Sequence, residues 1–147
     1  MKILVSACLL GENCKYSGGN NYNQAVCDFA RGHQVVPVCP EVLGGLPTPR
    51  CPAEIVQGVV TNKEGINVDR EFRAGAAKAL AIAKENWVEL AILQSRSPSC
   101  GVKEIYDGTF SGTKIPGQAV FAKMLMDEGI RVLDAGDVSY THLRAHE

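Results

Sequence analysis

The sequence predicts an α/β fold: a single three-layer domain with a mostly parallel, Rossmann-like sheet of about four strands and helices on both faces. Two observations lead to this prediction. Short apolar runs alternate along the chain with segments of helical periodicity, which is typical of strand–helix–strand units. Several runs are apolar throughout, as expected for parallel strands buried on both faces. A chain of 147 residues is long enough for one such domain with a substantial core.

The first part of the chain contains two predicted strands and the helix between them. Residues 2–6 and 34–38 are short apolar runs. Residues 22–31 carry apolar side chains on one helical face, and Gly32 ends that helix. Residues 39–52 then contain four prolines and two glycines, which exclude a helix through most of the segment. An ordered loop of this length in a compact domain is usually functional.

The middle of the chain predicts a hairpin followed by a long helix. Two β segments within residues 55–68 flank the turn residues 62–65. Asp69 is placed to cap a helix over residues 70–86. This helix has core-facing positions at helical spacing, which are Phe72, Ala76, Ala79, Leu80, Ala83 and Trp87.

The remainder of the chain supplies two more strands. Residues 89–94 form the third strand and lead into a turn that contains Ser97, Ser99 and Cys100. Residues 105–112 are rich in turn formers and predict a short hairpin or the edge of a lid. A helix over 118–128 and a strand at 130–133 complete the sheet.

The balance of charged residues argues against a highly charged binding partner. The chain has 15 basic and 16 acidic residues and a formal net charge of -1, so neither nucleic acid nor a membrane surface is an expected partner. No apolar run approaches the ~20 residues that span a bilayer. The first five residues lack the long apolar core and cleavage site of a signal peptide, so we expect a cytoplasmic protein.

The end of the chain differs from the rest. We expect one domain over residues 1–137, and residues 138–147 resemble the peptide produced when a sequencing-adapter sequence is translated. We therefore expect a non-native tail and exclude His142 and His146 from any site. The remaining histidine, His33, lies far from the carboxyl ends of the predicted strands, so a catalytic Cys–His pair lacks its histidine.

Three of the six cysteines follow predicted strands. Cys8 follows the first strand, Cys39 follows the second, and Cys100 lies in the turn after the third. Open α/β sheets bind ligands at the carboxyl ends of their strands. Disulfides would require an exported chain, whereas clustered thiols in a reducing cytosol are more often metal ligands or nucleophiles.

The spacing of these cysteines argues against zinc, which usually takes a close Cys-x-x-Cys pair. A 4Fe–4S cluster normally takes four thiolates, so three ligands would leave one iron open as a Lewis acid. Two alternatives stay open: the thiols are buried structural residues, or Cys14 supplies a fourth thiolate. Glu41, near Cys39 in a proline-stiffened loop, is a candidate general acid or base, although a loop glutamate is usually solvated.

Six motifs in order resemble those of a family long called a domain of unknown function, which includes the thiouracil desulfurases, also called desulfidases. The resemblance covers about residues 2 to 135. The motifs are residues 6–11 (SACLLG), 14–19 (CKYSGG), 39–50 (CPEVLGGLPTPR), 52–55 (PAEI), 97–101 (SPSCG) and 105–110 (IYDGTF).

The resemblance implies a 4Fe–4S cluster held by Cys8, Cys39 and Cys100. It also implies a non-redox reaction in which water replaces the thiocarbonyl sulfur of a base such as 2-thiouracil, giving uracil and sulfide. Glu41 and Ser97 match the positions that the family uses for proton transfer and for orienting water or substrate.

Further assignments come from the same motifs. We place Ser99, Tyr16 and Arg50 in substrate binding and keep Cys14 as a rival ligand, while Cys51 departs from the family pattern and is expected to be a bystander. The expected partners are a small thiolated base or nucleoside and the iron–sulfur assembly machinery. The alternative function is a non-catalytic iron–sulfur or metal-binding accessory or sensor module with four thiolate ligands, and a thiol-dependent enzyme without metal is a third possibility.

Overall fold

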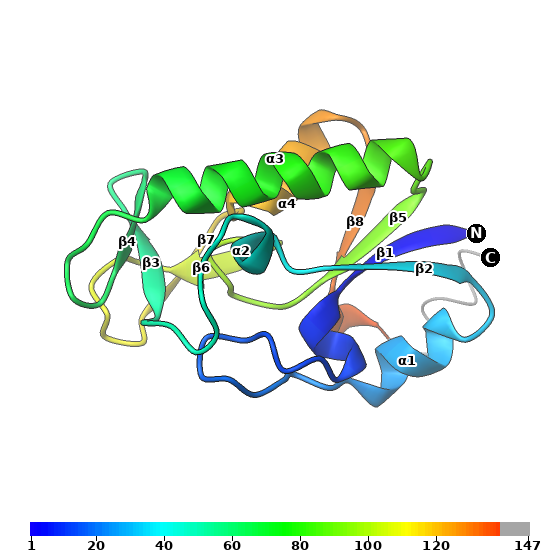
Figure 1. The fold of residues 1–147 in the computed structure, drawn as a ribbon, viewed down its shortest axis with the longest axis horizontal. Coiled ribbons are helices and arrows are strands. Elements are labelled where there is room, and N and C mark those ends of the chain that lie inside the picture. The colour runs from blue at the N-terminus through cyan, green and yellow to red at the C-terminus, as the bar shows by residue number, and fades with distance from the viewer. Residues whose placement is uncertain (139–147) are drawn as a thin grey trace.

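A four-stranded parallel sheet forms the centre of the molecule. The computed structural model describes residues 1–138, and the expectations for residues 139–147, including His142 and His146, lie outside this range. The strands are, in spatial order, β2 (Gln34–Val38), β1 (Lys2–Ser6), β5 (Leu90–Leu93) and β8 (Arg131–Asp134). Every neighbouring pair is parallel, which confirms the predicted fold class (Figure 1).

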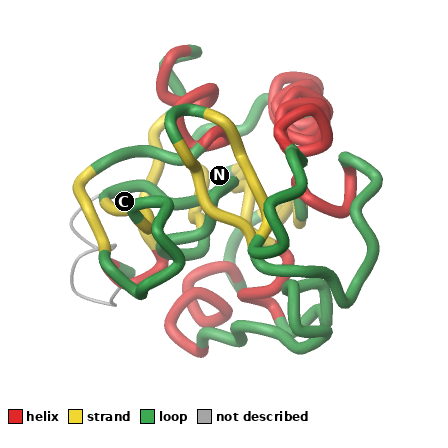
Figure 2. Tube along the Cα trace, turned by 90° about the vertical axis from the view of Figure 1, so that its left-hand side faces the viewer, coloured by secondary structure: helices red, strands yellow, loops and turns green. Residues whose placement is uncertain are grey.

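Helices cover both faces of this sheet. In β1, Ile3 and Val5 face the side of α1 (Gln24–Ala30), while Leu4 faces the side of α3 (Asp69–Glu85) and α4 (Val120–Asp127). Successive side chains of a strand point to opposite faces, so one short strand contributes to both cores. Helical segments accordingly lie above and below the strands in Figures 1 and 2.

The long helix α3 buries most of the side chains that were predicted to face the core, and it departs from the prediction at its two ends. Phe72, Ala76, Ala79 and Ala83 are buried against the sheet. Trp87 is 79% exposed, so its predicted place in the core is wrong. The helix ends at Glu85 and Trp87 has a φ of 53°, which breaks the helical spacing before the indole could reach the core.

The predicted cap of α3 is also wrong. Asp69 is the first helical residue, and Val68 occupies the N-cap position without a side-chain hydrogen bond. The Asp69 carboxylate instead accepts from the backbone N–H of Val60 at 2.9 Å and from Arg73 Nε at 2.8 Å. Asp69 therefore ties the start of α3 to the neighbouring strand β4 (Val59–Asn62).

Two hairpins stand beside one end of the sheet (Figure 1). The turn predicted at residues 62–65 is confirmed, because the N–H of Gly65 donates to the carbonyl of Asn62 at 2.9 Å and Thr61 forms an antiparallel bridge with Asn67. The first hairpin pairs β3 (Ala53–Val56) with β4 through a further turn at Gln57 and Gly58, which was not predicted. Both turn residues have positive φ, 50° and 81°, as a two-residue hairpin turn matched to strand twist requires. The second hairpin, β6 (Glu104–Tyr106) with β7 (Lys114–Pro116), confirms the hairpin predicted there.

A one-turn helix, α2 (Pro40–Leu43), occupies the start of the segment predicted to be irregular. It packs on α3 with almost no space between the backbones. A Cβ atom on Gly75 would collide with the carbonyl of Pro40, and one on Gly44 would collide with the carbonyl of Glu71. These two glycines therefore allow the close approach that fixes α2, and Glu41 within it, at the end of the sheet.

Residues 1–138 include two short 3-10 helices, η1 (Ala7–Leu10) after β1 and η2 (Ala135–Asp137) after β8. Val138, the first residue of the expected tail, is buried in the core that faces α1. Within residues 1–138, no helix combines the length and the apolar character needed to cross a membrane.

Candidate active site

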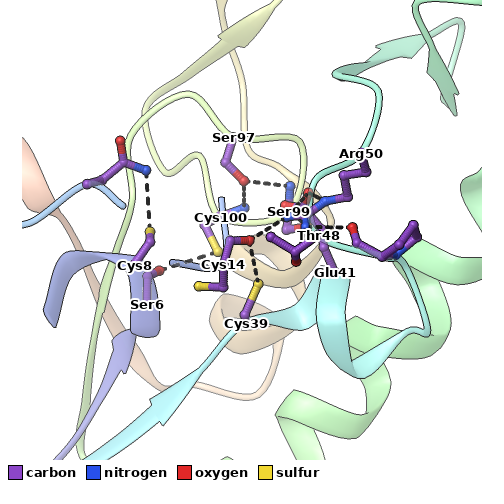
Figure 3. A network of polar contacts seen from close by, with 12 residues as sticks. Ser6, Cys8, Cys14, Cys39, Glu41, Thr48, Arg50, Ser97, Ser99 and Cys100 are labelled. Carbon is purple, nitrogen blue, oxygen red and sulfur yellow. Dashed lines mark hydrogen bonds and ion pairs between the residues drawn. The ribbon is translucent and has the colours of Figure 1, made fainter. Parts of the chain in front are cut away.

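Three cysteines from neighbouring strands line one cavity at the carboxyl edge of the sheet. Cys8 lies in η1 directly after β1, Cys39 directly follows β2, and Cys100 lies in the turn that follows β5. Because β2, β1 and β5 are adjacent and parallel, their ends meet at the same edge. The cavity they line has a volume of about 480 Å³. Figure 3 shows Cys8, Cys39 and Cys100 in the same region of the structure.

Two of these thiols receive hydrogen bonds from side chains. Asn21 Nδ2 donates to Cys8 Sγ at 3.5 Å, and Ser6 Oγ donates to Cys100 Sγ at 3.5 Å. The Ser6 oxygen also accepts the backbone N–H of Gln94 at 3.0 Å, which orients its hydroxyl. Burial raises the pKa of both thiols, and the two donated hydrogen bonds act against that rise by favouring the thiolates.

Cys14 and Cys51 line the same cavity. Burial raises the pKa of Cys14 to about 12, and the neighbouring thiols of Cys39 and Cys8 add to the rise. The Cys14 carbonyl accepts from the thiol of Cys39 at 3.9 Å. The structure therefore places the rival ligand Cys14 beside Cys39. Cys27, in contrast, donates to the carbonyl of Leu9 at 3.6 Å and lies outside the cavity lining.

A carboxylate held on both oxygens lies next to the thiols. Glu41 is in the first turn of α2 and lines the cavity. Its Oε1 accepts from Nε and Nη2 of Arg50, both at 3.1 Å, and its Oε2 accepts from Ser99 Oγ at 3.1 Å. The side chain of Glu41 is 15% exposed and that of Arg50 is 7% exposed. Glu41 therefore has a defined orientation but retains an exposed edge toward the cavity.

Arg50 was predicted to bind substrate, but its donors already contact the protein. Besides Glu41, its guanidinium donates to the carbonyl of Pro47 at 3.2 Å, to Thr48 Oγ1 at 3.1 Å and to the carbonyl of Cys14 at 2.9 Å. A planar guanidinium suits such a set of fixed acceptors. Arg50 thus joins the loop that follows α2 to the loop that carries Cys14.

The two serines of the turn before Cys100 lie in different places. Ser97 lines the cavity, and its Oγ accepts the backbone N–H groups of Ser99 and Cys100, both at 3.0 Å. Ser99, predicted to bind substrate, is fully buried and contacts Glu41. Tyr16, predicted to bind substrate, lines the cavity and is 47% exposed.

The donor set suits an iron–sulfur cluster better than a single metal ion. Among residues 1–138, no three His, Cys, Asp or Glu side chains are arranged to hold one metal ion. A cluster takes its thiolates on different iron atoms and so does not require the ligands to converge on one point. The thiols of Cys8, Cys39 and Cys100, with hydrogen-bond donors already aimed at two of them, fit that requirement.

Some contacts of the site had no counterpart in the sequence prediction. Ser6 and Asn21 donate to two of the thiols. The sequence prediction gave neither residue a role in the site, although Ser6 is the first residue of the motif at residues 6–11. Glu54 and Phe110 also line the cavity. Glu54 belongs to the motif at residues 52–55 and Phe110 to the motif at residues 105–110, and these motifs were the signal in the sequence that could have placed the two residues in the site.

Three comparisons with known proteins agree. The model of the 2-thiouracil desulfurase family matches residues 3–137. A Bacillus subtilis (strain 168) protein described as the uncharacterized protein YbbK is 40% identical over an alignment that covers 93% of this chain and 97% of that protein. A solved structure, described as the 4Fe-4S-dependent thiouracil desulfidase TudS (DUF523Vcz), has a TM-score of 0.89 and 35% identity, covering 99% of this chain and 97% of the other. This chain therefore belongs to the 2-thiouracil desulfurase family.

Proposed function

We propose that this protein is a 4Fe–4S-dependent desulfidase that acts on a small thiolated pyrimidine, as a base or a nucleoside. The reaction is R₂C=S + H₂O → R₂C=O + H₂S, which involves no net oxidation or reduction. One observation carries the proposal: three thiols from three adjacent strand ends and one clamped carboxylate line the same cavity. The 35% identity to a 4Fe–4S-dependent thiouracil desulfidase supports it.

In this proposal Cys8, Cys39 and Cys100 hold the cluster, which the iron–sulfur assembly machinery of the cell supplies. When bound, the cluster supplies an iron atom without a protein ligand, a Lewis acid that polarises the carbon–sulfur bond of the substrate. The buried thiols of Cys8 and Cys100 have raised pKa values, so binding the cluster releases their protons. The hydrogen bonds from Asn21 and Ser6 stabilise the resulting thiolates.

Glu41 is the proposed general base and acid. A carboxylate oxygen of Glu41 accepts a proton from water as the water oxygen attacks the thiocarbonyl carbon, and later returns it to the leaving sulfur. Ser97 is the proposed orienting residue. Its oxygen already accepts two backbone N–H groups, so its hydroxyl hydrogen remains to contact water or substrate. Tyr16 contacts substrate at the edge of the cavity.

Arg50 and Ser99 serve Glu41 in this proposal, in place of the substrate-binding role predicted from the sequence. Arg50 holds Oε1 and Ser99 holds Oε2, so the carboxylate enters the reaction without having to reorient. Such preorganisation is a principal source of catalytic rate.

Four-thiolate ligation is the second candidate. Cys14 lines the cavity beside Cys39, and a bond from Cys14 to the fourth iron would leave no iron open and would favour a non-catalytic accessory or sensor role.

We also place the protein in the cytoplasm, because all six cysteines are free thiols, which is typical of reducing compartments.

The test is anaerobic purification followed by iron and acid-labile sulfide analysis and an assay of sulfide and uracil release from 2-thiouracil. The proposal expects iron and sulfide in about a 1:1 ratio, as in a 4Fe–4S cube, and release of uracil and sulfide in equal amounts. A cluster-loaded protein that releases no sulfide from any thiolated pyrimidine would support the non-catalytic candidate. A protein that contains no iron after anaerobic reconstitution would contradict both.

A further inference from the structure

We infer that Phe110 determines which rings the cavity accepts, by offering an aromatic face to a planar thiolated base, and that Glu54 is the residue that positions it. The inference rests on the proposed function, because it concerns the substrate of the same cavity. Phe110 lies in the loop of residues 107–113 between β6 and β7, whereas Glu54 lies in β3, in a different motif of the sequence. Both residues line the cavity together with the proposed ligands Cys8, Cys39 and Cys100.

Glu54 holds the loop through two backbone contacts. Its Oε1 accepts the N–H of Gly108 at 2.9 Å and the N–H of Phe110 at 3.2 Å. Glu54 belongs to β3, which packs beside β6 (Figure 1), so its carboxylate links the two hairpins across the cavity wall. A charged acceptor that receives two amides gives stronger hydrogen bonds than a neutral one.

The backbone of the loop is held tightly around Phe110. Gly108 has a φ of 93°, and a Cβ atom there would lie 2.7 Å from the carbonyl oxygen of Ile55. Asp107 Oδ1 accepts the N–H of Thr109 at 2.9 Å and its hydroxyl at 2.6 Å. Phe110 itself has a φ of 57°, a conformation that bulky residues rarely adopt and that persists only where surrounding contacts impose it.

The hairpin of β6 and β7 is also attached to the segment that leads to Cys100. Arg96, in the segment between β5 and the Cys100 turn, forms a parallel bridge with Ile105 of β6. Tyr106, the next residue, lines the cavity as Phe110 does. The loop thus has a fixed place relative to the cysteines, which is what a specificity-determining residue requires.

The ligand chemistry follows from the ring. A thiolated pyrimidine is flat and conjugated, and any base with such a flat face can stack on an aromatic side chain. A saturated ring with the same thiocarbonyl group lacks that face. Phe110 therefore discriminates between a flat heterocycle and a puckered ring of equal size, a property independent of the thiocarbonyl chemistry.

The experiment compares 2-thiouracil with 5,6-dihydro-2-thiouracil on the cluster-loaded protein, together with the affinity of the product uracil by calorimetry. The wild type is expected to prefer 2-thiouracil in KM by at least about five-fold, the lower end of base–aromatic stacking. Phe110→Leu removes this preference and weakens uracil binding by a similar factor, while Phe110→Tyr keeps both. Glu54→Ala reduces the preference, and Glu54→Gln, which retains a carbonyl acceptor, keeps it.

The outcomes separate the inference from the proposed function. A cluster-loaded wild-type protein that releases no sulfide from any thiolated pyrimidine, as a base or a nucleoside, refutes the proposed function. A wild type that turns over 2-thiouracil, with a Phe110→Leu variant that retains both the preference and uracil affinity, refutes the role of Phe110 alone. If Glu54→Ala does not fold, Phe110→Leu and Phe110→Tyr still test whether Phe110 selects the ring. Glu54→Gln then tests whether Glu54 positions Phe110. A folded Glu54→Gln variant that loses the preference for 2-thiouracil refutes positioning through an accepted hydrogen bond.

Discussion

Arg50 Nη2 and Glu41 Oε1 lie 3.1 Å apart in an ion pair whose side chains are 7% and 15% exposed. The pair connects the two loops that follow α2 and η1, because the same guanidinium also binds the carbonyl of Cys14. It therefore links the proposed base to the wall of the cavity that carries a candidate ligand. Breaking it affects stability and chemistry together.

Arg50→Met is expected to destabilise the protein by about 3 kcal/mol, because it leaves the Glu41 carboxylate buried without its counter-charge. Arg50→Lys is expected to recover only part of this loss, since an ammonium cannot reproduce the planar contacts. Urea unfolding of the anaerobic protein measures the effect. An Arg70→Met variant, on the exposed surface of α3, provides the control and should change stability little.

Ser99→Ala is expected to lower kcat about ten-fold while KM changes little, because it releases one oxygen of Glu41 without removing a group that touches substrate. Steady-state sulfide release from 2-thiouracil measures both constants. Ser17→Ala, an exposed serine outside the cavity lining, is the matched control. A rise in KM at constant kcat would instead support the substrate-binding role predicted from the sequence.

The cluster ligands are tested by single Cys→Ser changes. Cys8→Ser, Cys39→Ser and Cys100→Ser are each expected to lose most of the bound iron, because each removes one of three thiolates. Cys14→Ser and Cys27→Ser are expected to retain it, the latter as the control outside the cavity. Iron content per chain after anaerobic reconstitution is the measurement. Equal iron loss in Cys14→Ser would establish the four-thiolate alternative.

The hydrogen bond from Ser6 to Cys100 Sγ is expected to affect the reduction potential of the cluster. Ser6→Ala should lower the reduction potential of the cluster, because a donor to sulfur stabilises the more negative reduced state. Spectroelectrochemical titration measures the shift, and Asn21→Ala should act in the same direction through Cys8. An unchanged potential in both variants would mean that these donors do not reach the ligating sulfurs.

Asp69 predicts a pH dependence of stability far from the active site. Burial alone would raise its pKa, but the hydrogen bonds from Val60 and Arg73 outweigh burial and hold the pKa below the usual 3.8. A depressed carboxylate pKa stabilises the fold above 3.8, and this contribution is lost as the pH falls through the folded-state value. Asp69→Asn should therefore cost about 1 to 2 kcal/mol at pH 7 and progressively less in acid. Unfolding curves at pH 7 and pH 3 test the difference, and a constant gap would contradict it.

The parallel character of the sheet and the edge that carries the site could be predicted from the sequence, whereas the order of the strands was not predicted. Apolar runs such as residues 2–6 and 34–38 have few other ways to fold, and parallel strands align their carboxyl ends. The places where the prediction failed depended on local backbone conformation. The positive φ of Gln57, in a turn that was not predicted, and the positive φ of Trp87, which exposes its side chain, leave no periodic signal in the sequence.

The α/β class, the family and the position of three cysteines after strands can be read from the amino-acid sequence, because they depend on local composition and on motif order. Which side chains meet at that edge depends on how the elements pack. Glu41 and Ser99 are 58 residues apart, and Glu54 and Gly108 are 54 apart, so their contacts exist only after the sheet, α2 and the two hairpins have packed. Hydrogen bonds between such distant residues depend on packing to within a few tenths of an ångström, and no pattern along the chain encodes that distance.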